Sequence, residues 1–184
     1  LPAVMPVVGS TLLWKLMIFQ DRNIINYVLS LLGIEGVSFL SPSLVLGTVT
    51  AINIWNGLGP SMLILLAGLQ GVPQDLTEAA QLDGANAALR FVKISLPMLS
   101  STLFFVIITG LIGAFQAYAE IKLLTGSMSE TVTMAMMVVN NAFSLDAYGI
   151  GYASAQGWII FAITLAFTAV FFGASKKGVY YAGQ

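Results

Sequence analysis

The stretch TEAAQLDGANAALRFVKISLP, residues 77–97, is a polar island between two long runs that carry no charge. Its pattern predicts a short helix, a break and then a second helix. Asp83 and Gly84 are expected to end the first helix, because glycine accepts the left-handed backbone in which helices commonly terminate. A second segment is expected from Ala85 towards Ile94, and Pro97 closes the island.

The start of the first helix can also be read from residue types. Pro73 can open it, because the missing proline N–H would lack a partner there anyway. Asp75 or Thr77 can cap free amide groups in the first turn. A plainer interpretation stays open at this point, because two amphipathic helices lying on a membrane surface would show much the same pattern.

The spacing inside the island resembles the signature loop of the permease subunits of ATP-binding-cassette importers. That loop has Glu-Ala-Ala, three residues, Gly, nine residues and then Ile-x-Leu-Pro. Every position is matched here, by Glu78, Ala79, Ala80, Gly84, Ile94, Leu96 and Pro97. The resemblance identifies the loop at residues 70–97 as the expected contact with an ATPase subunit.

Two further features resemble the subfamily that serves sugars and glycerol phosphates. The first is Asp-Gly-Ala at residues 83–85, followed by an aromatic residue at Phe91. The second is residues 124–131, which are similar to a Leu-Thr-Gly-Gly-Pro stretch of that subfamily, although Ser127 and Met128 depart from it. A sugar or oligosaccharide is therefore the expected substrate, with glycerol phosphate or another small solute as the alternative.

Composition places the whole chain in a membrane. Of 184 residues, 58% are hydrophobic and only 8% are charged, which is too little polar surface for a water-soluble globule. The formal net charge of −1, with scattered charges, gives no reason to expect a nucleic-acid partner. The chain has no cysteine and no histidine, so no catalytic residues, Cys/His metal site or disulfide are expected within it.

Four apolar segments are expected to span the membrane, approximately at residues 1–19, 44–69, 98–119 and 149–173, since a spanning helix needs about 20 residues. A short helix around residues 24–32 is expected in an external loop. The prediction is an all-α, polytopic helical bundle of the type I importer permease kind, forming a single transmembrane domain over residues 1–184. Subunits of the resembled family have roughly six spanning helices, so the chain is expected to be a fragment that lacks the N-terminal ones.

Polar side chains within the predicted spans are candidates for a substrate path. Asn53 and Asn56 lie on one helical stripe, and Trp55 beside them could stack on a sugar ring. Gln116 and Gln156 are the candidates on the third and fourth spans. The alternative is that these side chains only pack or form hydrogen bonds between helices, and the sequence leaves both interpretations open.

Two other classes of membrane protein, secondary transporters and intramembrane proteases, fit these patterns less well. A secondary transporter needs coupling-ion chemistry, and no Asp, Glu, Lys or Arg lies in the middle of a predicted span. An intramembrane protease that uses serine with histidine is excluded because the chain has no histidine, and one that uses paired aspartates is disfavoured because no Asp lies in the middle of a predicted span. A structural membrane subunit remains as the alternative without chemistry of its own.

The resemblance implies the rest of the mechanism. The short helix would dock in a cleft of a cytoplasmic ATPase subunit and carry its motion into the membrane. This chain has no G-x-x-x-x-G-K-[ST] loop, so ATP and Mg²⁺ are expected in partner subunits and no cofactor in this one. The implied partners are a second permease subunit, two ATPase subunits, an extracytoplasmic solute-binding protein and membrane lipid. The implied location is the cytoplasmic membrane of a bacterium or archaeon.

Overall fold

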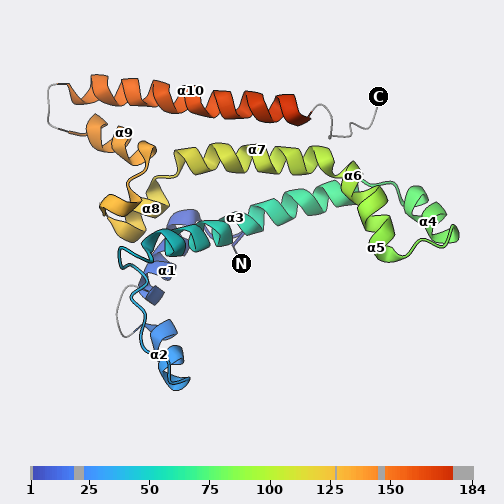
Figure 1. Ribbon diagram of the computed structural model, residues 1–184, viewed down its shortest axis with the longest axis horizontal. Helices are drawn as coiled ribbons and strands as arrows, with labels where there is room; N and C mark the ends of the chain where they lie inside the picture. The colour runs from blue at the N-terminus through green and yellow to red at the C-terminus, as the bar shows by residue number, and fades with distance from the viewer. Residues whose placement is uncertain (1, 19–22, 127, 145–147, 176–184) are drawn as a thin grey trace. The chain divides into compact units, whose positions relative to one another are not determined.

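The computed structural model describes residues 2–18, 23–126, 128–144 and 148–175, and all regular elements within these ranges are helical (Figure 1). The chain forms two compact units. The first comprises Leu1–Gly59 and Ala114–Phe161, and the second comprises Pro60–Gly113 and Ala162–Gln184. Three helices, α3 (Val45–Gln70), α7 (Ser100–Gln116) and α10 (Gly149–Ser175), contribute residues to both units.

The first unit is built around a small apolar core. Besides parts of the long helices, it contains α1 (Val7–Ile18), α2 (Ile24–Leu31), α8 (Ala119–Thr125), the 3₁₀ turn η2 (Ser129–Thr131) and α9 (Met134–Ala142). Its buried side chains come from helices distant in sequence and are Ile18, Val45, Val49, Ile52, Ile121, Leu124 and Met136. Val45 and Met136 are fully buried, so this cluster joins the start of α3 to α9.

Local side-chain hydrogen bonds define α2, which confirms the short helix predicted around residues 24–32. Asn23 caps its start by accepting from the Asn26 N–H at 2.7 Å. Asn26 in turn exchanges two hydrogen bonds with the backbone of Val37, at 3.0 and 2.9 Å. The helix ends at Leu31 with Leu32 as its C-cap, and Gly33 follows with a φ of +73°, a left-handed conformation that glycine adopts readily.

Two helices among the described residues are long and apolar enough to cross a membrane, namely α3 and Gly149–Gly173 of α10. A third span is present if the bent pair Ala87–Met98 and Ser100–Gln116 is counted as one. The predicted first span contains only the 12-residue helix α1 among its described residues, which is shorter than a span needs. The described chain therefore contains two to three spans, and the predicted number of four is approximate.

The two long helices are little covered by the rest of the chain. Only 17% of the most apolar window of α3 and 6% of that of α10 are buried. Such surfaces are stable against lipid or against other membrane helices, and not against water. The all-α membrane fold predicted from composition is confirmed.

In the second unit, close contacts join the helices that flank the predicted loop. Leu99, between the bent helices, is buried. A Cβ atom on Gly68 of α3 would lie 3.0 Å from the Leu99 Cδ2 atom. Further along α7, the rings of Phe104 and Phe172 of α10 meet edge to face with centroids 4.9 Å apart. The loop, which belongs to the second unit, thus begins and ends where α3 and α7 are in contact.

Candidate functional site

The predicted first helix of the loop is α4 (Gln74–Leu82), which begins directly after Pro73. The predicted capping by Asp75 or Thr77 is wrong, because no side chain caps the start of α4. The helix already begins at Gln74, so Thr77 lies inside it, and the Thr77 hydroxyl donates back to the Gln74 carbonyl at 2.7 Å. Asp75 still lies in the first turn, where its negative charge interacts favourably with the positive end of the helix dipole.

The end of α4 is a Schellman motif, in which two backbone bonds close the last turn. The Ala85 N–H donates to the Ala80 carbonyl at 2.9 Å, and the Gly84 N–H donates to the Gln81 carbonyl at 3.1 Å. Asp83 is the C-cap residue and Gly84 has a φ of +83°. The helix stop predicted at Asp83 and Gly84 is confirmed.

The second segment of the loop is a continuous helix that changes its pitch. It consists of α5 (Ala87–Arg90), the π-helical turn η1 (Phe91–Ser95) and α6 (Leu96–Met98). The Leu96 N–H donates to the Phe91 carbonyl, which is the wider π-type spacing. Pro97 explains why the helix widens here: it has no N–H to donate to the Lys93 carbonyl, and its ring would clash with that group in a regular α-helix.

A sharp bend joins this segment to the membrane helix. The axis of Ala87–Met98 and that of Ser100–Gln116 differ by 63°, and the buried residue Leu99 lies at the break. The loop helices therefore leave the line of α7, as Figure 1 shows for α4, α5 and α6 at the end of α3 and α7.

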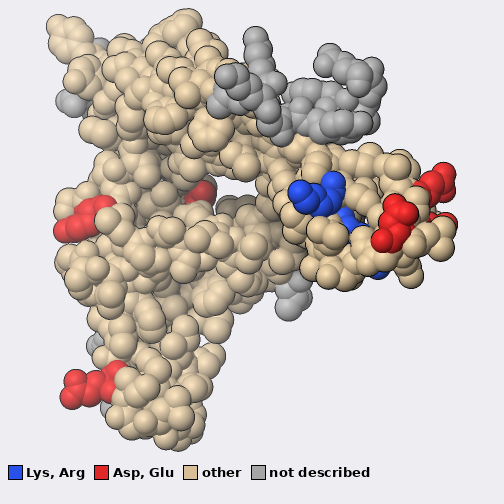
Figure 2. Space-filling model, turned by 45° about the vertical axis from the view of Figure 1, so that its right-hand side comes forward, with Lys and Arg blue, Asp and Glu red and all other residues tan. Residues whose placement is uncertain are grey.

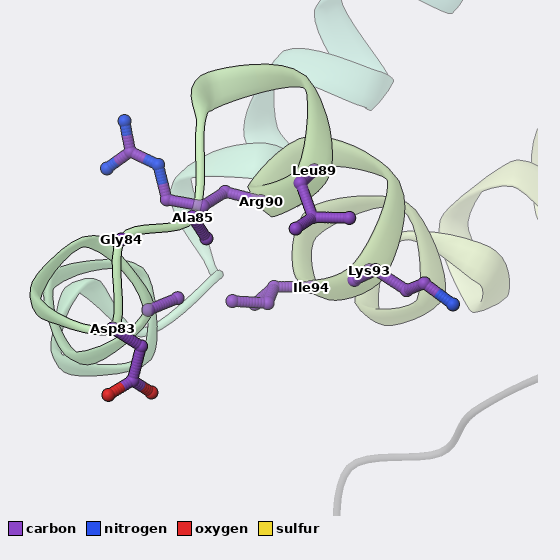
Figure 3. A pocket seen from close by; sticks show the side chains of 8 residues that line it. Asp83, Gly84, Ala85, Leu89, Arg90, Lys93 and Ile94 are labelled. Carbon is purple, nitrogen blue, oxygen red and sulfur yellow. The ribbon is translucent and has the colours of Figure 1, made fainter.

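Most of the predicted loop residues line one open pocket of about 410 Å³ between the end of α4 and the second segment (Figure 3). These are Ala80, Asp83, Gly84, Ala85 and Ile94, joined by Leu89, Arg90 and Lys93. In Figure 3 the Leu89 and Ile94 side chains point towards the space beside α4, while the carboxylate of Asp83 points away from it. The motif thus brings together residues from both sides of the Gly84 turn.

The remaining predicted loop residues lie outside that pocket. Pro97 lines a second pocket of about 270 Å³ with Leu76, Met98 and two residues that also line the first pocket, Lys93 and Ile94. Glu78, Ala79 and Leu96 are exposed, and α4 has no buried residue. Most of the surface of α4 is therefore not covered by the described part of the chain.

Two side-chain hydrogen bonds within the loop were not predicted from the sequence. Figure 2 shows acidic and basic side chains gathered over the α4–α5 end of the molecule. Arg90 Nη1 donates to Gln81 Oε1 at 2.7 Å, linking α5 to the last turn of α4. Asn86 Oδ1 accepts from the Leu89 N–H at 2.8 Å and caps α5. The Asn86 cap was readable from sequence, because asparagine before a helical run is a standard start signal.

The first two candidates for the substrate path differ in their partners. Asn53 Nδ2 donates to the Val49 carbonyl of its own helix at 3.1 Å. Asn56 Oδ1 accepts from the Ser10 hydroxyl of α1 at 2.7 Å. Asn56 Nδ2 and Thr11 Oγ1 are buried without a hydrogen-bond partner among the described residues. Asn56 therefore links two helices and keeps one donor unused.

The other candidates lie against different elements of the first unit. The rings of Trp55 and Trp14 meet edge to face with centroids 5.6 Å apart. Gln156 Oε1 of α10 accepts from Asn141 Nδ2 of α9 at 2.8 Å. Gln116, the last residue of α7, is exposed. Each contact is compatible with packing, and contact with a substrate stays a prediction.

Comparison with known proteins matches residues 1–176 of the chain to the family model of the binding-protein-dependent transport system inner membrane component. The trehalose/maltose transport system permease protein MalF of Thermococcus litoralis is 35% identical over 173 residues, which are 93% of this chain and 58% of that protein. The sn-glycerol-3-phosphate transport system permease protein UgpA of Brucella suis is 34% identical over 182 residues, 97% of this chain and 61% of that protein. The chain thus spans less than two thirds of the length of these relatives.

A solved structure shares the fold. It is a bacterial alginate ABC transporter in complex with an alginate pentasaccharide-bound periplasmic protein. The TM-score is 0.84 at 22% identity, and the match covers 96% of this chain and 62% of that one. The helical arrangement is therefore that of an importer permease.

Proposed function

The chain belongs to the family of binding-protein-dependent transport system inner membrane components, and we propose that it forms part of a permease subunit of an ATP-driven importer for a sugar or oligosaccharide. The observation that carries the proposal is the loop at residues 70–97. It matches the importer signature at every position. Its first helix, α4, has no buried residue, and its second segment meets α7 at a 63° bend.

In this proposal α4 is the coupling helix. Its exposed residues, Glu78 and Ala79 among them, would enter a cleft of a cytoplasmic ATPase subunit as an amphipathic helix enters a groove. Gly84 would set the turn that aims the helix, since its φ of +83° suits glycine best. Ile94, Leu96 and Pro97 would build the segment that passes motion on to α7. ATP and Mg²⁺ would be bound by the partner ATPase, and this chain would hold no cofactor.

Alternating access would follow from rigid-body motion of the loop. A push on α4 would reach α7 through the 63° bend and α3 through the contact at Gly68. Both helices would then tilt together and would expose a central path first to one side of the membrane and then to the other. The chain would not be an enzyme itself.

A neutral polyhydroxyl substrate is supported by the side chains of the long helices. Asn53, Trp55, Asn56, Gln116 and Gln156 would line the path, and no Lys or Arg occurs in α3, α7 or α10. Amides and indole rings suit sugar hydroxyls and ring faces, whereas a phosphate favours cationic partners. The similarity to a trehalose/maltose permease supports this class. Glycerol phosphate is the second candidate, supported by the similarity to an sn-glycerol-3-phosphate permease.

The assembly would contain a second permease subunit, two ATPase subunits and an extracytoplasmic solute-binding protein. The binding-protein complex of the alginate transporter supports the last of these partners. The location would be the cytoplasmic membrane of a bacterium or archaeon. Exposed apolar surface on α3 and α10 leaves room for contacts with both lipid and a second permease subunit.

The test is ATP hydrolysis by the full-length subunit, co-expressed with the products of neighbouring genes and reconstituted in lipid, across a panel of loaded binding proteins. Stimulation by a sugar-loaded binding protein is expected. Stimulation by a glycerol phosphate-loaded one would select the second candidate. If no ATPase copurifies, or if hydrolysis is indifferent to every ligand, the importer proposal is wrong.

A further inference from the structure

Apart from the two backbone hydrogen bonds of the Schellman motif, few contacts fix the direction of α4 relative to the rest of the loop. The helix has no buried residue, so apolar burial does not hold it in place. The open pocket of about 410 Å³ lies between its end and the second segment, so the side chains of Ala80, Leu89 and Ile94 do not close the joint. Glycine at the turn leaves the backbone there freer than any other residue would.

We propose that Arg90 is a positioning residue for coupling, because its hydrogen bond to Gln81 holds the last turn of α4 against α5 and makes the loop one rigid body. The inference rests on the proposed function. Arg90 Nη1 lies 2.7 Å from Gln81 Oε1. In Figure 3 the Arg90 side chain runs from its helix past Ala85 on the side of α4. The bond therefore spans the joint that the apolar side chains leave open.

The chemistry of the pair suits this role. A guanidinium group is planar, is always charged and presents several donors in a fixed fork. A hydrogen bond with one charged partner is stronger than one between neutral groups. Arg90 is half-buried, which limits the number of conformations its side chain adopts. Gln81 lies in the last turn of α4. Its side-chain Oε1 accepts from Arg90, and its backbone carbonyl accepts from the Gly84 N–H at 3.1 Å. The bond thus acts on the turn that Gly84 closes.

Arg90 is also placed to pass motion onwards. It is the last residue of α5, and η1 and α6 continue from it without a break as far as Met98. At Leu99 the helix bends by 63° into α7, and Leu99 lies against Gly68 of α3. Any force on α4 that crosses the Gln81–Arg90 bond therefore reaches the contact between α3 and α7. Without that bond, α4 would rotate about Gly84, and less of the force would reach the contact between α3 and α7.

The geometric test uses a full-length subunit in which the two introduced cysteines are the only ones, and residues 1–184 contribute none of their own. Spin labels are attached through Asp75→Cys on α4 and Val92→Cys on η1, both exposed positions, in the full-length subunit in lipid nanodiscs. Pulsed electron paramagnetic resonance then measures the distance distribution between the labels. Arg90→Ala and Gln81→Ala are each expected to broaden it, and the double variant is expected to broaden it no further, because both remove the same bond.

Two variants control for charge and for conservative change. Lys93→Ala removes a positive charge one turn from Arg90, and Lys93 makes no hydrogen bond or ion pair within the described residues, so the distribution should stay narrow. Arg90→Lys keeps one donor and should restore part of the narrow distribution. An unchanged distribution in Arg90→Ala, or equal broadening in Lys93→Ala, would overturn the proposal.

The functional arm measures uptake per ATP hydrolysed in the reconstituted complex. Arg90→Ala and Gln81→Ala are expected to lower this ratio about fivefold, the scale of an exposed polar bond, while Arg90→Lys recovers part of it. A lower ratio with an unchanged label distance would overturn the positioning role but leave the importer function intact. A complex without ATPase partners would overturn the proposed function, although the label distances would still report whether the bond orders α4.

Discussion

Gly68 of α3 lies so close to Thr102 of α7 that a Cβ atom at position 68 would come within 2.8 Å of the threonine hydroxyl oxygen and 3.0 Å of its methyl carbon. Real Cβ atoms essentially never approach within 3.0 Å of another heavy atom. The two helices that carry the loop therefore meet so closely that a side chain at position 68 would force the Thr102 side chain to shift. Small residues have this role in membrane helix pairs generally.

Gly68→Ala is expected to separate α3 from α7 and to destabilise the protein by about 1–3 kcal/mol, the usual effect of overpacking. The measurement is thermal unfolding of the full-length subunit in detergent. Gly47→Ala, in the same helix with nothing within 4 Å of the new Cβ, is the matched control and should leave the midpoint almost unchanged. Adding Thr102→Ala to Gly68→Ala should restore part of the stability. An additive double variant would contradict a direct contact.

Gly84→Val is expected to uncouple ATP hydrolysis from uptake while membrane insertion and assembly are kept. The Cβ atom at position 84 would meet nothing within 4 Å, so the cost is the left-handed backbone, about 1–2 kcal/mol. The measurement is the ratio of substrate taken up to ATP hydrolysed in proteoliposomes. Gly110→Ala, which has open space and no positive φ, is the control. Normal uptake by Gly84→Val would show that the turn does not aim α4.

Asn56→Leu is expected to leave the melting temperature of the subunit unchanged or raised and to abolish its response to substrate. The change removes a buried donor without a partner in the described residues, which costs about 1–3 kcal/mol when left unpaired. Leucine has a similar branched shape, and the Ser10 hydroxyl keeps the Val7 carbonyl at 2.9 Å as its acceptor. Because an unpaired buried donor is costly, we expect Asn56 Nδ2 to have a function, namely contact with the substrate.

The control for this experiment is Ser10→Ala, which removes the donor to Asn56 Oδ1 but keeps the amide. It should lower stability by about 1 kcal/mol with little change in the response to substrate. The measurements are thermal unfolding and ATPase stimulation by loaded binding protein. If Asn56→Leu instead prevents assembly, Asn56 is a packing residue between α1 and α3 and not a contact with substrate.

Trp14 and Trp55 are expected to be coupled by about 1 kcal/mol, because an edge-to-face aromatic pair contributes beyond the area that it buries. The measurement is a double-mutant cycle of Trp14→Leu and Trp55→Leu, read by unfolding free energy. If only Trp55→Leu changes ATPase stimulation by a sugar-loaded binding protein, Trp55 also contacts substrate. A coupling energy near zero would mean that the two rings do not stabilise the contact between α1 and α3.

Much of the loop was predictable because its causes lie within a few residues of each other. The end of α4 at Asp83 and Gly84 follows from the glycine, and the widening at residues 91–95 follows from Pro97 two residues later. The capping of α4 by Asp75 or Thr77 was predicted and is wrong, because the helix already begins at Gln74 and both residues lie inside its first turn. The residue at which a helix begins is not determined by residue spacing alone.

The membrane spans and the candidate path show where such prediction ends. Apolar length identified α3 and α10. The third predicted span, residues 98–119, corresponds to the 17-residue helix α7, which is long enough to cross a membrane only when it is counted together with Ala87–Met98, bent from it by 63°. The helical stripe through Asn53 and Asn56 was visible in the sequence, yet Asn53 bonds its own helix while Asn56 bonds α1. Periodicity says which side chains share a face, and it does not say which helix covers that face.

The sequence by itself determined the class of the protein, the place of the signature loop and the turn at Gly84, since composition, spacing and a glycine act through solvent and local backbone alone. Only the tertiary structure decided that Arg90 reaches Gln81, that Gly68 meets Thr102 and that Ser10 donates to Asn56. These partners lie on different helices. Their contacts depend on how the helices bend and approach, which is settled by packing over the whole unit.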